Sequence, residues 1–209
     1  MIKLPDAYKD KQEWTILGPM GPQIPPHLSS YPILAIDGGG HYSDRIDVWV
    51  GDSDSLKKEI SPVASFKFPP EKESSDLALG LELFKQSGPM KLHLWGFRGG
   101  RIDHELFNLG ECMRFLSTHP ESQILMYGED GKVYFHLVGE GHWNFEYEGI
   151  FSIGTVKKTI VRLKGACDYP LLKETIILPL SSLGLSNVAH GKVQLETQGA
   201  VFIAFPEGK

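Results

Sequence analysis

Blocks of hydrophobic residues recur through the first 130 positions, and their lengths and spacing predict strands separated by helices. Apolar residues at helical spacing predict helices over Leu77–Gln86 and Asp103–Ser117, and a short helix is expected over Leu56–Ile60. The expected strands are Trp14–Leu17, Ile33–Ile36, Asp47–Val50, Ser65–Phe68, Lys91–Trp95 and Ile124–Tyr127. Strands that alternate with helices predict an α/β domain with a mostly parallel sheet and helices on both faces.

The pattern changes from about Lys132 onward, where short strands follow one another between turn residues and no convincing helix remains. The expected strands are Val133–Leu137, Trp143–Tyr147, Thr159–Leu163, Thr175–Leu178, Lys192–Leu195 and Ala200–Ile203. This arrangement predicts an all-β sandwich or flattened barrel. We therefore expect an α/β domain over residues 1–130 and a β-sandwich domain over residues 131–209.

One connection in the first half is unusually short for a parallel sheet. Only the nine residues from Gly38 to Ile46 join two of the expected strands. A parallel crossover usually needs about a dozen residues or more. Either these two strands are not neighbours, or they are joined by a loop without a helix.

Acidic side chains follow several of the expected strands: Asp37, Asp52, Asp54, Glu73 and Asp76. The carboxyl ends of parallel strands share one edge of a sheet, which is where such sheets bind ligands. Side-by-side carboxylates repel one another unless a cation lies between them, and oxygen ligands suit Mg²⁺. Each acid also has a plainer interpretation, as a turn residue or, for Asp76, as a helix N-terminal carboxylate.

Further candidate phosphate-binding groups lie after two strands. Gly38 and Gly39 have no Cβ, so their N–H groups can approach a phosphate, although glycine runs are more often plain turns. Arg101 offers a fork of donors at the start of a helix, and Asp103 can orient it. His104 and Asn108 are one helical turn apart and can face the same site, although a packed or surface residue is the better explanation for His104 taken alone.

Composition and charge narrow the possible partners. The 209 residues are 41% hydrophobic and 22% charged, which is ordinary for a globular protein. The net charge of −5 argues against a nucleic-acid-binding surface, and no apolar run reaches the length of a membrane span. Cys112 and Cys167 match no metal-binding spacing and are expected to be free thiols in the cytoplasm.

Taken in order, these stretches resemble the thiamine pyrophosphokinase family along nearly the whole chain. The segments that resemble family motifs are Asp37-Gly38-Gly39, Gly51-Asp52-Ser53-Asp54-Ser55, Glu71-Lys72-Glu73-Ser74-Ser75-Asp76, Gly99-Gly100-Arg101-Ile102-Asp103-His104 with Asn108, Gly165 with Tyr169-Pro170-Leu171, and Ser186-Asn187. No single motif is decisive, but their common order is a fairly specific signal.

The resemblance implies a homodimeric enzyme in which the thiamine hydroxyl attacks the β-phosphorus of ATP and AMP leaves. It implies that Asp52, Asp54 and Asp76 hold Mg²⁺, with Asp37 close by. It places Gly38, Gly39, Glu73, Ser75, Arg101, Asp103, His104 and Asn108 on the nucleotide side, and Tyr169, Ser186 and Asn187 in the thiamine pocket, across the dimer interface.

The chain departs from the family pattern mainly where the acceptor is expected to bind. Gly40 to Arg45 replace an Ala-Asn pair and a helix, and Glu73 and Ser75 stand where Asp and Thr are usual. Two alternatives therefore stay open: a pyrophosphokinase for another hydroxymethyl acceptor such as a pterin, and a degenerate domain that binds nucleotide or thiamine diphosphate without turnover.

Overall fold

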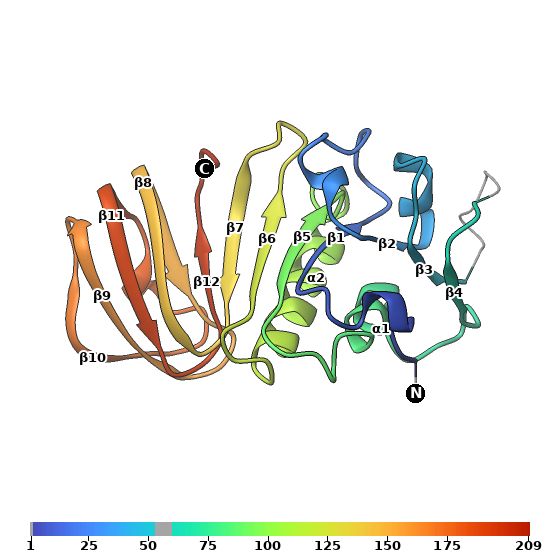
Figure 1. Ribbon diagram of the computed structural model, residues 1–209. Helices are drawn as coiled ribbons and strands as arrows, with labels where there is room; N and C mark the ends of the chain where they lie inside the picture. Colours follow the sequence, from blue (N-terminus) through green and yellow to red (C-terminus); the bar gives the residue numbers. More distant parts are fainter. Residues whose placement is uncertain (1, 53–59) are drawn as a thin grey trace.

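The computed structural model describes residues 2–52 and 60–209, and twelve strands in these ranges form one sheet (Figure 1). The strands are β1 (Glu13–Leu17), β2 (Ile33–Ile36), β3 (Val48–Gly51), β4 (Ala64–Lys67), β5 (Lys91–Trp95), β6 (Gln123–Tyr127), β7 (Val133–Val138), β8 (Gly141–Gly154), β9 (Thr159–Cys167), β10 (Leu171–Ile177), β11 (Asn187–Thr197) and β12 (Val201–Ala204). The helices are α1 (Asp76–Glu82) and α2 (Ile102–Leu116), with 3₁₀ turns η1 (Asp6–Tyr8), η2 (Leu28–Ser30), η3 (Asp37–Tyr42) and η4 (Ser182–Gly184).

The first six strands are parallel and lie in the order β4-β3-β2-β1-β5-β6. The chain adds β2, β3 and β4 on one side of β1 and then returns to place β5 on the other side. The carboxyl ends of β1, β2 and β5 therefore meet where the strand order reverses, which is the usual ligand-binding position in such sheets. The short connection after β2 is a loop with the 3₁₀ turn η3, and β2 and β3 are direct neighbours.

Both α-helices pack on the same face of this parallel part. Leu81 and Phe84, at and just beyond the end of α1, and Met113 of α2 are at most 4% exposed and share one core cluster with Trp14 and Leu34 of the sheet. On the opposite face the irregular segment between β1 and β2 supplies the cover. Its Ile24 and Leu28 belong to a second cluster, together with sheet residues such as Ile33, Trp49 and Trp95.

The expectation of an α/β domain with helices on both faces is therefore wrong. The described chain is mostly β, with a twelve-stranded sheet and two α-helices on one side of it. Fully apolar strands do require cover on both faces, but a Pro-rich coil provides it on one of them. The short helix expected over Leu56–Ile60 falls largely on residues outside the described ranges.

The antiparallel half continues the same sheet instead of forming a separate sandwich. β7 pairs with β6 across the expected domain boundary, and the order continues β7-β12-β8-β11-β9-β10. Within β8, residues 152–154 pair with β12 and residues 141–151 pair with β11. Figure 1 shows these strands curving around their own core, which includes Phe145, Phe151 and Val193. The division into domains at residue 130 stays a prediction.

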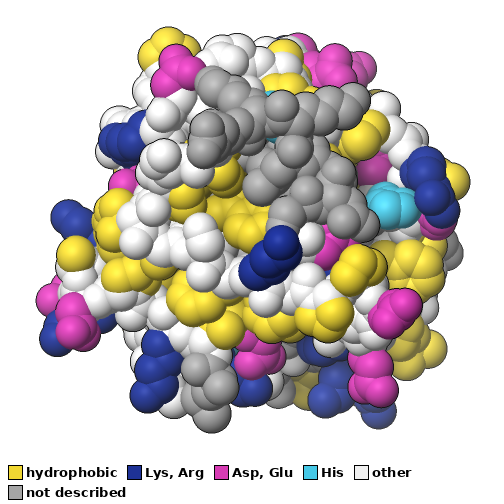
Figure 2. All heavy atoms as spheres, turned by 90° about the vertical axis from the view of Figure 1, so that its right-hand side faces the viewer, with side chains coloured by type: hydrophobic (Ala, Val, Ile, Leu, Met, Phe, Trp, Pro, Cys, Tyr) yellow, Lys and Arg dark blue, Asp and Glu magenta, His cyan; other side chains and the backbone are white. Residues whose placement is uncertain are grey.

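The surface seen from the β4 edge is mixed in character. Figure 2 shows hydrophobic side chains across the middle of this view and charged side chains mostly toward its rim. Of the helices in the described ranges, none is long and apolar enough to span a membrane.

Candidate functional site

A cleft of about 520 Å³ lies at the carboxyl ends of the parallel strands, and we call it the strand-end cleft. It is bounded by the segments that follow β1, β2, β3 and β5 and by the first turns of α1 and α2. Among the residues that line it are Met20, Asp37, Asp52, Lys72, Ser75, Asp76, Phe97, Arg101, His104, Glu105 and Asn108. Seven of these were expected from the sequence: Asp37, Asp52, Ser75, Asp76, Arg101, His104 and Asn108.

Asp37 occupies an unusual backbone position directly after β2. Its φ is +50°, a left-handed conformation that aspartate tolerates better than most residues, and its carbonyl accepts a 3.0 Å hydrogen bond from Trp49 Nε1. Its Oδ1 atom is buried and has no hydrogen-bond partner among the described residues. A buried carboxylate oxygen without a partner is costly, so this atom is suited to a ligand.

Gly38 and Gly39 are buried beneath Asp37 and are not among the lining residues. A Cβ at Gly39 would lie 2.1 Å from the carbonyl oxygen of Leu17, so glycine allows η3 to pack on the end of β1. The structure thus gives Gly39 a packing role, and its expected contact with phosphate stays a prediction.

Lys72 lies between two of the expected carboxylates. Its Nζ is 3.5 Å from Asp52 Oδ2 and 3.2 Å from Asp76 Oδ1, and the three side chains are only 12%, 16% and 21% exposed. Burial alone would lower the pKa of Lys72, but the hydrogen bond and charge of Asp76 and the charge of Asp52 raise it above its ordinary value. The cleft therefore stabilises a positive charge between Asp52 and Asp76.

Asp76 begins α1, and Ser75 caps the helix by accepting a 3.1 Å hydrogen bond from the Ala78 N–H. Burial raises the pKa of Asp76; Lys72 lowers it in part, while the negative charges of Asp37 and Asp52 raise it further. The three carboxylates are thus close enough to repel one another, and Lys72 does not neutralise them completely.

Hard cations fit this set of donors, because all of its groups are carboxylate oxygens and one of them has no partner. Within residues 2–52 and 60–209, no three acidic, histidine or cysteine side chains already converge as a metal site. Asp54, the third expected ligand, lies outside the described residues. Mg²⁺ keeps several waters and takes few protein carboxylates, so a cation shared with substrate phosphates is compatible with this geometry.

Arg101 stands at the N-terminal end of α2 and is paired with Asp103. Its Nε and Nη2 donate hydrogen bonds of 3.1 and 2.5 Å to the two carboxylate oxygens, so the guanidinium is held by a two-point contact. The hydrogen bond and charge of Asp103 raise the pKa of Arg101. Asp103 does not line the cleft, and its contact is with Arg101.

Several lining residues were not expected from the sequence. Glu105 accepts a 2.5 Å hydrogen bond from the Gly99 N–H and so fixes the loop before α2. Lys72 was expected only as part of a resembling segment and not as a charge between two aspartates, because it lies in the loop before α1, whose path the sequence pattern does not specify. Glu73 was expected at the nucleotide, but it is exposed and is not among the lining residues.

The expected acceptor-binding residues, Tyr169, Ser186 and Asn187, lie together at the other end of the sheet, and we call them the acceptor group. The Tyr169 N–H donates to Asn187 Oδ1 at 3.0 Å, and Asn187 Nδ2 donates to the Tyr169 carbonyl at 2.8 Å. Ser186, with φ +57°, precedes β11, and its N–H donates to Ser152 Oγ at 3.0 Å. The ring of Tyr169 is left exposed, at 66% for the residue.

Strand order separates this group from the strand-end cleft within one chain. Tyr169 follows β9 and Asn187 begins β11, while Asp37 and Asp52 follow β2 and β3 near the opposite edge. At about 4.8 Å per strand, the separation along the sheet is roughly 35–45 Å. The structure brings seven of the expected metal and nucleotide residues together in the cleft, but it does not bring the expected acceptor residues to them.

Comparison with known proteins gives one family and a set of similar folds. Residues 29–125 match the family model described as "Thiamin pyrophosphokinase, catalytic domain", a segment that contains β2 to β5, most of β6 and both α-helices. No curated protein sequence matches the chain.

Solved structures resemble the chain over nearly its full length. Thiamine pyrophosphokinase from Bacillus subtilis is 19% identical, with 92% of this chain and 97% of that chain covered and a TM-score of 0.69. Thiamin pyrophosphokinase from Geobacillus thermodenitrificans is 21% identical, with 91% and 95% covered and a TM-score of 0.66. The enzyme from Candida albicans is 14% identical, with 95% and 90% covered and a TM-score of 0.63. At these identities the likeness establishes a shared fold.

Proposed function

We propose that this chain, whose residues 29–125 match the family model of the thiamin pyrophosphokinase catalytic domain, is a member of the thiamine pyrophosphokinase family and transfers the diphosphate of ATP to the hydroxyl of thiamine. The products are thiamine diphosphate and AMP. The observation that carries this proposal is the strand-end cleft, where Asp37, Asp52 and Asp76 face one another and Arg101 stands at the rim. Phosphoryl-transfer sites work mainly by positioning and by charge, which these side chains can supply.

Asp52 and Asp76 would hold Mg²⁺, together with Asp54. When bound there, the metal would neutralise charge on the polyphosphate as the bond to the leaving group breaks. Lys72 now faces both aspartates, so it would turn toward the phosphates when a cation takes its place. Asp37, with its unpartnered Oδ1, would accept a hydrogen bond from the attacking hydroxyl.

The N-terminal end of α2 would bind the nucleotide. Arg101 would direct its guanidinium to a phosphate while Asp103 fixes the orientation of that group. His104 and Asn108 lie one helical turn apart on the cleft side of α2 and would contact the rest of the nucleotide. Met20, which is 44% exposed, would supply apolar surface against which a base can pack.

A second copy of the chain would complete the site, because Tyr169, Ser186 and Asn187 are too far from Asp52 to act in the same chain. Two sets of exposed apolar side chains fit such a homodimer. Ile102, Leu106 and Phe107 of α2 are 60–82% exposed beside the cleft, and Leu172, Leu178, Leu180, Leu183 and Leu185 are 54–68% exposed near the acceptor group. In a two-fold dimer the α2 set of each chain would face the leucine set of the partner, so the same contact would be made twice.

The free thiols of Cys112 and Cys167 support a cytoplasmic setting, which belongs to the same proposal.

The test is AMP release from ATP and Mg²⁺, with thiamine present or absent and the products separated by chromatography. We expect thiamine-dependent AMP, with thiamine diphosphate formed in equal amount. Asp76→Asn should lower the rate by about 10³-fold, since a metal-binding carboxylate becomes neutral. Asp10→Asn, which removes an exposed aspartate outside the cleft, should leave the rate unchanged.

Other outcomes would replace the proposal. AMP formed with a hydroxymethyl pterin but not with thiamine would assign a different acceptor. Binding of Mg-ATP without AMP formation with either acceptor would assign a binding role. Activity that is unchanged in Asp76→Asn would place the chemistry outside the strand-end cleft.

A further inference from the structure

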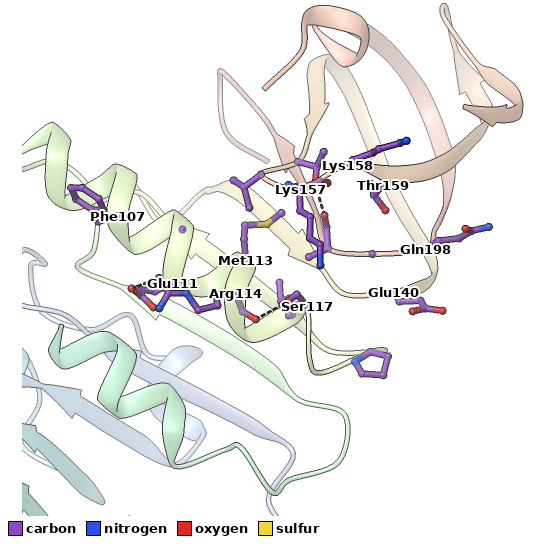
Figure 3. Close-up of a pocket in the computed structure, with 17 residues that line it drawn as sticks. Phe107, Glu111, Met113, Arg114, Ser117, Glu140, Lys157, Lys158, Thr159 and Gln198 are labelled. Carbon is purple, nitrogen blue, oxygen red and sulfur yellow. Dashed lines mark hydrogen bonds and ion pairs between the residues drawn. The ribbon is translucent and has the colours of Figure 1, made fainter. Parts of the chain in front are cut away.

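A second cavity, of about 460 Å³, lies between the C-terminal half of α2 and the antiparallel part of the sheet (Figure 3). Its other walls come from the β8–β9 connection, residues 155–158, and from the β11–β12 turn, residues 198–200. None of the residues that line it lines the strand-end cleft. It is therefore a separate site, and we call it the α2–β9 cavity.

The α2–β9 cavity is lined by three basic and two acidic side chains, a small positive excess on a chain whose net charge is −5. Lys157 and Lys158 border it and form no ion pair with any residue in the described ranges, whereas Arg114 is paired with Glu111 at 3.2 Å. Figure 3 shows Lys157 reaching toward α2, while Lys158 points away from it. The remaining acid, Glu140, is solvent-exposed. Lys157 thus presents an uncompensated charge to the cavity.

A buried hydroxyl without a partner lies at the same place. Thr159, at the start of β9, is 7% exposed, and its Oγ1 has no hydrogen-bond partner among the described residues. Thr155, at the other end of the same connection, is 1% exposed, and its single O–H has the carbonyl oxygens of Lys157 and Ala200 within reach as acceptors, at 2.7 and 3.0 Å. Buried hydroxyls are normally satisfied in this way, and Thr159 Oγ1 and Ser181 Oγ are the two in the described ranges that are not. Of these two residues, Thr159 lines the cavity, so its hydroxyl is free to bind a ligand there.

Gly199 keeps space open beside that hydroxyl. A Cβ at position 199 would lie 2.7 Å from Thr159 Oγ1, which is closer than a carbon atom can approach without displacing it. Because Thr159 lines the cavity and its O–H has no other acceptor, it is the donor that an acceptor bound in the cavity would meet after a small rearrangement. An anion near Lys157 Nζ would meet both a positive charge and an O–H donor.

Apolar side chains form another part of the lining. Met113 and Leu116 of α2 are buried to 1% exposure and form the floor, while Phe107 and Val156 are 71% and 44% exposed at the border. We propose that the α2–β9 cavity binds a small molecule with an anionic head group, either phosphate or carboxylate, on an apolar ring. The head group contacts Lys157 and Thr159, and the ring lies against the apolar lining.

The experiment measures protection of single lysines from acetylation by peptide mass spectrometry. Phenyl phosphate and benzoate are the probes, and phenol is the uncharged control. We expect phenyl phosphate or benzoate to slow acetylation of Lys157 by about fivefold or more, with no effect of phenol. Lys72 reports in the same digest on the strand-end cleft, and Lys173, an exposed lysine outside both sites, reports on the surface. Stronger protection by one probe identifies the head group.

Variants separate binding from folding, with affinity measured by titration calorimetry. Lys157→Gln should weaken binding about tenfold, and Thr159→Val about fivefold, whereas Thr159→Ser keeps the hydroxyl and should bind as the unmodified chain does. Lys173→Gln removes the same charge at the surface and should have no effect. Equal affinity in Thr159→Val and the unmodified chain would overturn the proposal, and so would protection of Lys72 without protection of Lys157.

Discussion

Mixing two inactive variants tests whether the site is built from two chains. Asp76→Asn removes a carboxylate of the strand-end cleft, and Tyr169→Ala removes the exposed ring of the acceptor group. Tyr169 is a suitable position because its hydrogen bonds to Asn187 are made by its backbone, so the substitution leaves them in place. Each variant alone should lose thiamine diphosphate formation, at low thiamine concentration in the case of Tyr169→Ala.

Strand order sets the expected recovery. Since roughly 35–45 Å of sheet separates the two groups, each site would take its cleft from one chain and its acceptor group from the other. Random pairing of the two variants makes half of all dimers mixed, and each mixed dimer has one site in which both parts are intact. The mixture should therefore recover about one quarter of the unmodified activity for a two-fold dimer.

Coexpression with two different tags gives the mixed dimer, which is purified through both tags and assayed for AMP release. This preparation should have about one half of the unmodified activity, because one of its two sites is intact and the inactive homodimers have been removed. Asp76→Asn mixed with Asp52→Asn is the matched control, because both changes lie in the cleft and no dimer of the two has an intact site. Recovery no greater than the mean of the two single variants would refute the argument from strand order. It would place the acceptor group and the cleft in the same chain.

Three further predictions concern charge, packing and pH. Lys72→Met should lower the free energy of unfolding by about 2 kcal/mol without Mg²⁺, because it leaves the carboxylates of Asp52 and Asp76 facing each other. Mg²⁺ should then raise the melting temperature of this variant more than that of the unmodified chain. Equal shifts in the two proteins would contradict a cation position shared by Lys72 and Mg²⁺. Thr159→Val should raise the free energy of unfolding by about 1 kcal/mol, because it removes an unsatisfied hydroxyl. Thr155→Val should lower it by about 1–2 kcal/mol, because it removes a hydroxyl that is hydrogen-bonded. Chemical denaturation measures both changes, and changes of the same sign would contradict the assignment. Burial lowers the pKa of His136 from 6.5 to about 3, so between pH 6.5 and pH 5 the unfolded chain binds a proton that the folded chain does not. The free energy of unfolding should therefore fall by about 2 kcal/mol over this range. His136→Gln should remove this part of the pH dependence of stability, and an unchanged pH dependence would show that other groups cause it.

The helices of the parallel half were predictable because their apolar positions repeat at helical spacing. The α2 helix was expected over Asp103–Ser117 and spans Ile102–Leu116. The predicted stripe, Leu77 and Leu81 of α1 and Phe84 just beyond its end, is at most 4% exposed. The helix α1 ends at Glu82, earlier than expected, because the chain leaves the helix for a series of tight turns.

The faces of the sheet were not predictable in the same way. An apolar strand indicates that both of its faces are covered, but it does not say what covers them. Here Ile24 and Leu28, in a segment whose prolines exclude a long helix, cover the face opposite α1 and α2. The continuity of the sheet from β6 to β7 also escaped prediction, because a change from helix-rich to strand-rich sequence looks the same whether or not the strands on either side pair.

The candidate site was predictable to the extent that strand ends determine position. Asp37, Asp52 and Asp76 lie together because each follows a parallel strand or begins the next helix, which a sequence can show. The position of Lys72 between two of them depends on the path of the loop before α1, which the sequence pattern does not specify. The separation of Tyr169 from the cleft depends on the order of the strands, which alternation along the chain leaves open.

The apolar stripe of α2 was predicted correctly, but packing in the core explains only part of it. Ile102, Leu106, Leu109, Met113 and Leu116 repeat at helical spacing. Met113 and Leu116 are buried in the core, but Ile102 and Leu106 are 82% and 60% exposed in the single chain. Exposed apolar side chains in continuous register with a core stripe are typical of an interface between chains. The stripe therefore belongs partly to the core and partly to the face that, in the proposed homodimer, receives the acceptor group of the partner.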